Sequence, residues 1–233
     1  MSEKDVWIGT SAPAARTASP RVIDGHGTLY HRTPIAENAD TDSTRCTGPL
    51  NPYAASKFEL DQQMRTRHAA GLDWIGLRYT NVFGLDESDK GPMASILSQL
   101  LRQAAGTGHI RVFADSLTAA RDYVSVESVT TTILHLATTR LPVSAAVYNL
   151  GTSCAVSFAE IAQWCARLHR EATSQPLHVE LVPNPVPSAY QYFTCADMTA
   201  LDKALSDRPT EPDASVQARA AELFTTFRSR ATG

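Results

Sequence analysis

The 233-residue sequence predicts an α/β fold with a parallel sheet, because helix-like and strand-like segments alternate along most of the chain. The clearest pair is a capped helix that begins at Pro52 and a buried strand that follows it from Leu72 to Gly84. The hydrophobic content of 43% and the charged content of 19% are typical of a globular protein with a sizeable core. The net charge of −3, without any run of Lys and Arg, argues against a nucleic-acid-binding surface.

The first fifty residues contain little that predicts regular structure. Residues 5–11 have the pattern of a short buried strand, whereas residues 12–50 are rich in Pro, Gly, Thr, Asp and Arg and predict an irregular loop. Loops of this length are uncommon inside compact domains unless they are functional or disordered. A helix is expected to follow, with Asn51 as N-cap, Pro52 at the first helical position and Gly71 just after its end.

Downstream segments continue the alternation of helices and strands. A capping box, Ser157-Phe-Ala-Glu160, marks the start of one of the helices. We expect helices over residues 93–105, 129–138, 157–170, 199–205 and 215–228. We expect strands over residues 109–113, 122–126, 146–150 and 179–182.

Composition excludes several other classes of protein. The four cysteines form no Cys-x-x-Cys pair and the seven histidines include no His-x-x-x-His, so neither a metal site nor a disulfide framework is predicted. Each cysteine is expected to be a small buried residue. No segment approaches the roughly 18 apolar residues that cross a bilayer, and the N-terminus lacks the apolar core of a secretion signal. We therefore expect a cytoplasmic protein with no membrane or nucleic-acid partner.

Tyr53 and Lys57, in Tyr53-Ala-Ala-Ser-Lys57, are spaced to share one face of the predicted helix. A phenol with a pKa of about 10 is too weak an acid to be ionised at neutral pH, but a nearby ammonium and an oxidised nicotinamide favour its anion. The phenolate can then take a proton from a sugar hydroxyl while hydride leaves the carbon for a nicotinamide cofactor. The motif alone is weakly specific, so its context decides.

Three segments in order carry a family resemblance: a strand ending in Thr10-Ser11, then the Tyr53–Lys57 segment, then Leu77-Arg-Tyr-Thr-Asn-Val-Phe-Gly84. They resemble the extended short-chain dehydrogenase/reductases, which include nucleotide-sugar epimerases and dehydratases. Asp89-Lys-Gly-Pro-Met-Ala-Ser95 and Tyr190-Gln-Tyr-Phe-Thr-Cys-Ala-Asp-Met-Thr199 are similar to the ADP-glyceromanno-heptose 6-epimerases among them. The resemblance implies an isomerase of carbohydrate metabolism that inverts C6 of an ADP-linked heptose by transient oxidation with NADP or NAD.

The resemblance also implies which residues form the site. Tyr53 and Lys90 would be the two bases, one on each face of the reacting carbon, and Ser11 would polarise the reacting hydroxyl. Lys57, Val82 and Lys90 match cofactor-binding positions. The positions that match substrate-binding residues are Asn81, Gln99, Phe113, Ala114, Asp115, Ser116, Arg121 and Tyr190.

Plainer interpretations of three of these residues stay open. Lys90 can be a solvated loop residue, since a lysine acts as a base only where burial or a neighbouring positive charge lowers its pKa. Arg121 suits a diphosphate as a fork-shaped donor, but it can instead form a structural ion pair with Asp122 or another carboxylate. Tyr190 follows a Pro-rich loop and can equally be a packing residue.

One feature of the family is missing, because no Gly-x-x-Gly-x-x-Gly turn opens a helix. The sequence therefore predicts a truncated Rossmann-like doubly wound parallel sheet with a small α/β substrate-binding lobe. Residues 1–85 would form the C-terminal part of the NAD(P)-binding domain. Residues 86–233 would form mainly the substrate lobe, with residues 122–152 returning to the sheet. The spacing between Ser11 and Tyr53 is also longer than in the family.

Three hypotheses about function follow. The first is an active epimerase, completed by a separate N-terminal half or by a rearranged cofactor site. The second is a catalytically silent module that binds a sugar nucleotide or another protein, and the third is a related sugar-nucleotide dehydratase or reductase. The expected small-molecule partner is a nucleotide-diphosphate-sugar. An unpaired sheet edge where the missing strands would lie favours a homo-oligomer or a complementing N-terminal half.

Overall fold

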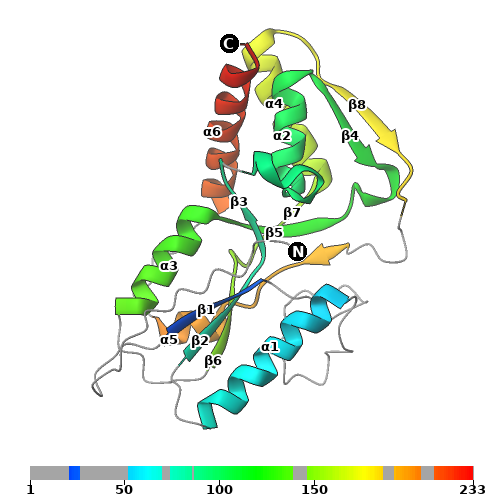
Figure 1. The fold of residues 1–233 in the computed structure, drawn as a ribbon. Coiled ribbons are helices and arrows are strands. Elements are labelled where there is room, and N and C mark those ends of the chain that lie inside the picture. Colours follow the sequence, from blue (N-terminus) through cyan, green and yellow to red (C-terminus); the bar gives the residue numbers. More distant parts are fainter. Residues whose placement is uncertain are drawn as a thin grey trace.

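The computed structural model describes residues 21–26, 52–69, 74–85, 87–138, 146–185, 192–205 and 213–232. These ranges form two lobes (Figure 1): a parallel sheet with helices beside it below, and a group of helices with a two-stranded ribbon above. The strands between the lobes connect them directly. Within the described ranges, no helix is both long enough and apolar enough to cross a membrane.

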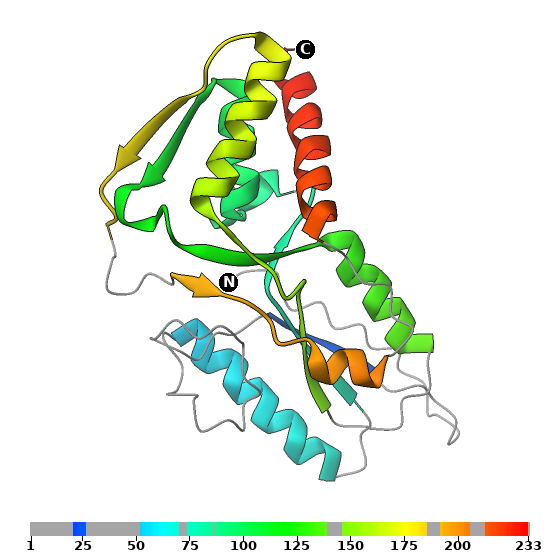
Figure 2. The same cartoon turned by 180° about the vertical axis from the view of Figure 1, so that it is seen from behind.

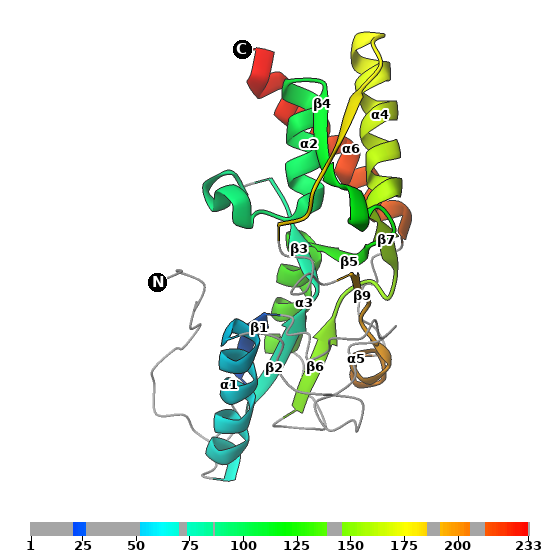
Figure 3. The ribbon, with the colours of Figure 1, turned by 90° about the vertical axis from the view of Figure 1, so that its right-hand side faces the viewer.

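The lower lobe is built on a three-stranded parallel sheet with β2 at its centre. All six residues of β2 are buried, so both of its faces are covered. Ile75, Leu77 and Tyr79 pack on one face with residues of α3 and α5, and α1 contacts β1 and β2 from the other side (Figure 3). The elements of this lobe are β1 (Arg21–His26), α1 (Pro52–Ala69), β2 (Trp74–Tyr79), α3 (Val126–Thr138), β6 (Ala146–Leu150) and α5 (Thr199–Ala204).

A parallel sheet covered by helices on both faces is the doubly wound arrangement that the sequence predicts. β1 pairs with β2 from Arg21 opposite Trp74, and β2 pairs with β6 from Ile75 opposite Ala146. Seen from behind, α5 lies against β6 (Figure 2). The helix predicted from Pro52 is confirmed, and so is the strand predicted over residues 146–150.

The position of β1 corrects one expectation. β1 lies inside residues 12–50, where the sequence predicts only an irregular loop. Its apolar pattern is limited to Val22 and Ile23, which is too short to indicate a strand. The segment is a strand because it pairs with β2, and the sequence of β1 alone does not reveal this partner. The strand predicted over residues 5–11 lies outside the described residues.

A second correction concerns the single strand predicted over residues 72–84. The structure divides it at Thr80 into β2 and β3 (Asn81–Phe83), and the backbone N–H of Thr80 makes the last hydrogen bond to β6, donating to the carbonyl of Leu150 at 3.0 Å. β2 belongs to the lower sheet, whereas β3 pairs in parallel with β5 (Ala120–Ser125). β5 also pairs with β7 (Ala155–Ser157) and β9 (Phe193–Thr194).

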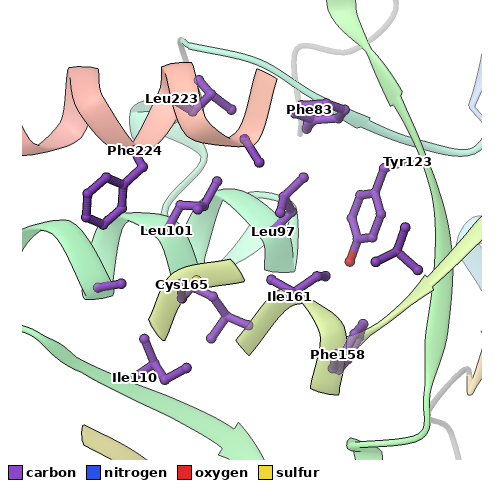
Figure 4. Packing of buried hydrophobic residues seen from close by; sticks show 14 of the residues in the cluster. Phe83, Leu97, Leu101, Ile110, Tyr123, Phe158, Ile161, Cys165, Leu223 and Phe224 are labelled. Carbon is purple, nitrogen blue, oxygen red and sulfur yellow. The ribbon is translucent and has the colours of Figure 1, made fainter. Parts of the chain in front are cut away.

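The upper lobe has its own core, formed mainly by three helices (Figure 4). The ring of Tyr123 meets that of Phe83 edge to face, with centroids 6.3 Å apart. Burial raises the pKa of the Cys165 thiol to about 12, as expected for a small core residue. The elements of this lobe are α2 (Ile96–Gly106), β4 (His109–Phe113), α4 (Phe158–Thr173), β8 (His178–Val182) and α6 (Asp213–Thr232).

These elements confirm the helices predicted over residues 93–105, 157–170 and 215–228 and the strands over 109–113 and 179–182, with end shifts of a few residues. α2 begins later than expected because a 3₁₀ helix, η1 (Ser88–Met93), precedes it and Ser95 is its N-cap. The division of the chain into domains near residue 85 stays a prediction.

The capping box at the start of α4 is complete. The Ser157 hydroxyl accepts from the backbone N–H of Glu160 at 3.2 Å, and the Glu160 carboxylate accepts from the backbone N–H of Ser157 at 2.8 Å. We expect Ser157→Ala to lower the free energy of unfolding by about 1 kcal/mol in urea denaturation. Ser229→Ala, on the exposed face of α6, is the matched control. Equal effects of the two changes would contradict the role of the cap.

Candidate functional site

A cavity of about 270 Å³ lies at the carboxyl end of β3. Its lining residues come from β3 and the turn after it, from η1 and from the start of α3; they are Val82, Phe83, Gly84, Leu85, Glu87, Lys90, Val126 and Glu127. A second cavity of about 220 Å³ shares four of these residues and extends to α6. β3 follows directly after β2, so the cavity lies on the carboxyl side of the central strand of the doubly wound sheet, the side on which ligands of such proteins bind. This cavity is therefore the candidate site.

Two of the three predicted cofactor-binding residues, Val82 and Lys90, lie together in the lining of this cavity. Ligand pockets are typically about 300–1,000 Å³, so the cavity fits one end of a dinucleotide and not the whole. Its wall is apolar at Val82 and Leu85, and Lys90 and Glu87 provide charge. An apolar wall with a few polar groups is typical of a small-molecule pocket.

Lys90 is held by an ion pair. Its Nζ lies 3.1 Å from Oε1 of Glu87, and its side chain is 34% exposed. Lys90 is therefore not a freely solvated loop lysine. Gly91, the next residue, has a φ of +49°, a conformation that favours glycine and turns the chain at this point.

Glu87 is the anchor of this loop, and sequence reasoning missed it. The residue is 4% exposed, and its carboxylate accepts from Lys90, from the backbone N–H and hydroxyl of Ser95, and from the hydroxyl of Ser98. Burial alone would raise the pKa of Glu87. The hydrogen bonds from Ser98 and Ser95 and the charge of Lys90 outweigh burial, so its pKa is lowered and the group is a carboxylate at neutral pH.

Gln99 supports the same loop. Its Nε2 donates to the carbonyls of Pro92 at 3.1 Å and Ala94 at 2.8 Å. Its amide nitrogen is thus used to hold η1 against α2. A direct role of Gln99 in binding substrate stays a prediction.

Asn81 and Arg121 are built into the packing between the lobes. Nδ2 of Asn81 donates to the carbonyl of Asp122 at 3.0 Å and to the hydroxyl of Thr194 at 3.1 Å. Arg121 is buried, donates to the carbonyl of Ala120 at 3.1 Å, and lies over the ring of Phe158, 5.5 Å from its centroid.

Residues 113–116 form a separate region of the surface, outside the lining of the cavity. Phe113 ends β4 and Ala114–Ser116 form a 3₁₀ turn, in which the hydroxyl of Ser116 donates to the carbonyl of Phe113 at 3.0 Å. The Asp115 carboxylate accepts from the hydroxyl of Tyr192 at 2.8 Å. None of residues 113–116 lines the cavity, and their role in binding substrate stays a prediction.

The remaining predicted residues are only partly described. Tyr53 and Lys57 both belong to α1, and Lys57 is half-buried; the side chain of Tyr53 lies outside the described part. Ser11 and Tyr190 also lie outside it. The approach of Tyr53 and Lys57 to the cavity stays a prediction.

Asp122 is a second residue whose importance the sequence did not reveal. It is fully buried, and its carboxylate accepts four hydrogen bonds, from the N–H and hydroxyl of Thr152 and from the N–H groups of Ser153 and Ala196. Asp122, Thr152, Ser153 and Ala196 together form what we call the Asp122 junction. Burial raises the pKa of Asp122 above its ordinary value, although the four hydrogen bonds partly oppose this. A polar residue inside a buried strand pattern was the only signal in the sequence.

A parallel sheet covered on both faces, a Tyr-x-x-x-Lys helix beside it and a lysine at the carboxyl end of a neighbouring strand define the extended short-chain dehydrogenase/reductase class. Within that class, residues 25–151 match the NAD dependent epimerase/dehydratase family. The match covers just over half of the chain, which therefore belongs to this family.

Individual relatives agree with this assignment. The chain is 29% identical over 176 residues to an ADP-L-glycero-D-manno-heptose-6-epimerase of Brachyspira hyodysenteriae. The aligned residues make up 74% of this chain and 54% of the relative. The chain thus spans about half the length of that relative.

Two solved structures show the fold alone. An ADP-L-glycero-D-manno-heptose-6-epimerase of Helicobacter pylori matches with a TM-score of 0.69 at 22% identity, over 88% of this chain and 60% of the other. A UDP-glucose 4-epimerase of Thermus thermophilus in complex with NAD matches with a TM-score of 0.67 at 22% identity, over 88% and 64%.

Proposed function

We propose that the protein is a nucleotide-sugar epimerase that inverts C6 of an ADP-linked heptose by transient oxidation with NADP or NAD. The observation that carries the proposal is the cavity at the end of β3, where Val82 and Lys90 lie together. Family membership supports a nicotinamide-dependent sugar enzyme, and the name of the Brachyspira relative favours the heptose. The Thermus structure, which is similar to this chain in fold, is a UDP-glucose 4-epimerase, so we propose the heptose and do not take it from the fold.

The chemistry divides between the cofactor and the protein. The nicotinamide, when bound beside Val82 and Lys57, would supply the reversible uptake of hydride from the sugar carbon. Tyr53 takes the hydroxyl proton at its Oη, with the Lys57 ammonium favouring the phenolate. After the sugar has turned over in the site, Lys90 gives a proton to the same oxygen from the other face. Inversion requires hydride to return to the opposite face of the carbon, and two such groups are needed because the oxygen of the turned-over sugar then faces a different side of the site.

The hydroxyl-polarising role has two candidates. Ser11 precedes the part of the chain that matches the family, which begins at Gly25. β1 ends at His26 beside β2, and Thr28 follows two residues later in the sequence. We propose Thr28 as the alternative to Ser11. Thr28→Ala would then lower kcat while Ser11→Ala would not.

Substrate binding completes the proposal. Arg121 would bind the diphosphate, and Asn81, Gln99, residues 113–116 and Tyr190 would contact the rest of the sugar nucleotide. A second copy of the chain or a complementing N-terminal half would supply further walls of the cofactor site, since the chain spans about half of its relative.

The proposal is tested by incubating the purified chain with NADP or NAD and one C6 epimer of ADP-glyceromanno-heptose. Formation of the other epimer, followed by NMR of the sugar, is the expected result. Conversion of UDP-glucose instead would contradict the choice of heptose. Binding of ADP-heptose without bound cofactor and without turnover would favour the silent binding module over the enzyme.

A further inference from the structure

The carboxylate of Glu87 organises the whole loop that carries Lys90. One oxygen, Oε1, accepts from Lys90 Nζ and from the N–H of Ser95, both at 3.1 Å. The other, Oε2, accepts from the Ser95 hydroxyl at 2.7 Å and from the Ser98 hydroxyl. Glu87 therefore connects the start of α2 to Lys90 through a single buried group.

The rest of the loop is fixed independently of Lys90. The N–H of Ala94 donates to the carbonyl of Gly91 at 3.2 Å, and Gln99 holds the carbonyls of Pro92 and Ala94. These bonds locate the backbone on the C-terminal side of Lys90 but leave its long side chain undetermined. The ion pair with Glu87 is what holds Nζ, and both residues line the cavity.

We propose that Glu87 is the positioning residue of the epimerase, holding the Lys90 ammonium at the cavity as the proton donor of the return step. This inference rests on the proposed function. An exposed ion pair contributes little, but here the Glu87 side chain is only 5% exposed although that of Lys90 is 34% exposed, so the carboxylate side of the pair is shielded from water.

The pairing also orders the two proton transfers. Lys90 begins as an ammonium and cannot accept the first proton, so Tyr53 Oη takes the proton from the sugar hydroxyl. Lys90 Nζ then gives its proton to the sugar oxygen and becomes a neutral amine. Each inversion moves one proton in net from Lys90 to Tyr53, and exchange with solvent restores both groups.

A readout that does not need turnover is available because the chain has four lysines, Lys4, Lys57, Lys90 and Lys203. Reductive methylation with ¹³C-formaldehyde gives each lysine its own NMR signal, and Lys90→Arg identifies that of Lys90. Glu87→Gln keeps the size of the side chain and removes its charge. We expect it to move the Lys90 signal and leave those of Lys57 and Lys203 in place.

The kinetic readout uses the same variant. A positioned proton donor contributes about 10²–10⁴-fold, and we expect Glu87→Gln to lose about 10–100-fold of this in kcat, measured at saturating cofactor. Ser98→Ala is the matched control, because it removes a hydrogen bond to the same carboxylate and leaves the ion pair. It is expected to lower thermal stability but to preserve the Lys90 signal.

The outcomes separate this inference from the proposed function. If Glu87→Gln leaves the Lys90 signal and kcat unchanged while the wild type turns over, the positioning role is wrong and the function stands. If Ser98→Ala lowers kcat as much as Glu87→Gln does, and neither change moves the Lys90 signal, then Glu87 only stabilises the loop and does not position Lys90. If the signal moves but the wild type lacks epimerase activity, Glu87 does hold Lys90 and the proposed function is wrong.

Discussion

Tyr53→Phe is expected to lower kcat for epimerisation by about 10²–10⁴-fold, the usual contribution of a positioned acid–base group. Phenylalanine keeps the ring but lacks the hydroxyl that takes the sugar proton. Because the change removes only this group, cofactor binding should be retained. The measurement is the rate of interconversion of the two ADP-heptose epimers, followed by NMR.

Two controls show whether the loss is chemical. The thermal unfolding midpoint of Tyr53→Phe should equal that of the wild type, because an α-helix is held by its backbone hydrogen bonds and the change keeps the ring. Its affinity for NADP should also be unchanged. A variant that keeps the wild-type kcat would show that Tyr53 is not the base.

Asp122→Ala should be strongly destabilising, by about 3–5 kcal/mol in the free energy of unfolding, because a buried donor left without an acceptor costs about 1–3 kcal/mol and the change leaves several. The donors are those of the Asp122 junction. Urea denaturation measures the loss. Asp202→Ala, at an exposed carboxylate of α5, is the control and should change stability by less than about 0.5 kcal/mol. Equal effects would show that the junction does not stabilise the fold.

The effect of Asp122 should also depend on pH. Since its pKa is raised in the folded protein, the folded state binds its proton more tightly than the unfolded state does. Its contribution is therefore full below the pKa of the unfolded chain and falls as pH rises through the pKa of the folded protein. Compared with Asp122→Asn, which does not titrate, the wild type should lose relative stability over that interval. A wild type that instead gains free energy of unfolding relative to Asp122→Asn as pH rises would contradict the raised pKa of Asp122.

The helices were predictable because their signals are local. Pro52 at a first turn and the Ser157–Glu160 capping box each mark a helix start within four residues of sequence. β1 and the division at Thr80 were not predictable, because both depend on partners far away. The chain changes pairing partner at Thr80, from β6 on the β2 side to β5 on the β3 side, and neither partner is near in sequence.

The candidate site divides in the same way. Val82 and Lys90 were found through short motifs that resemble a family, and the structure places both in one cavity. Glu87 and Asp122 were not found, since no local motif marks Glu87 as buried and the only signal for Asp122 is a polar residue inside a buried strand pattern. Each is defined by its donors, and for Asp122 one donor is Ala196, 74 residues away.

The distances along the chain that separate these partners have a consequence for folding. The central strand of the lower sheet is synthesised well before its neighbour β6, and Asn81 bonds to Thr194, which is 113 residues further on. Contacts of such long range must overcome loop-closure entropy before they stabilise anything, so they form late and slowly. A nascent chain released before Thr194 would leave Asn81 without Thr194 and Asp122 without Ala196, and would expose the unfinished sheet to other chains.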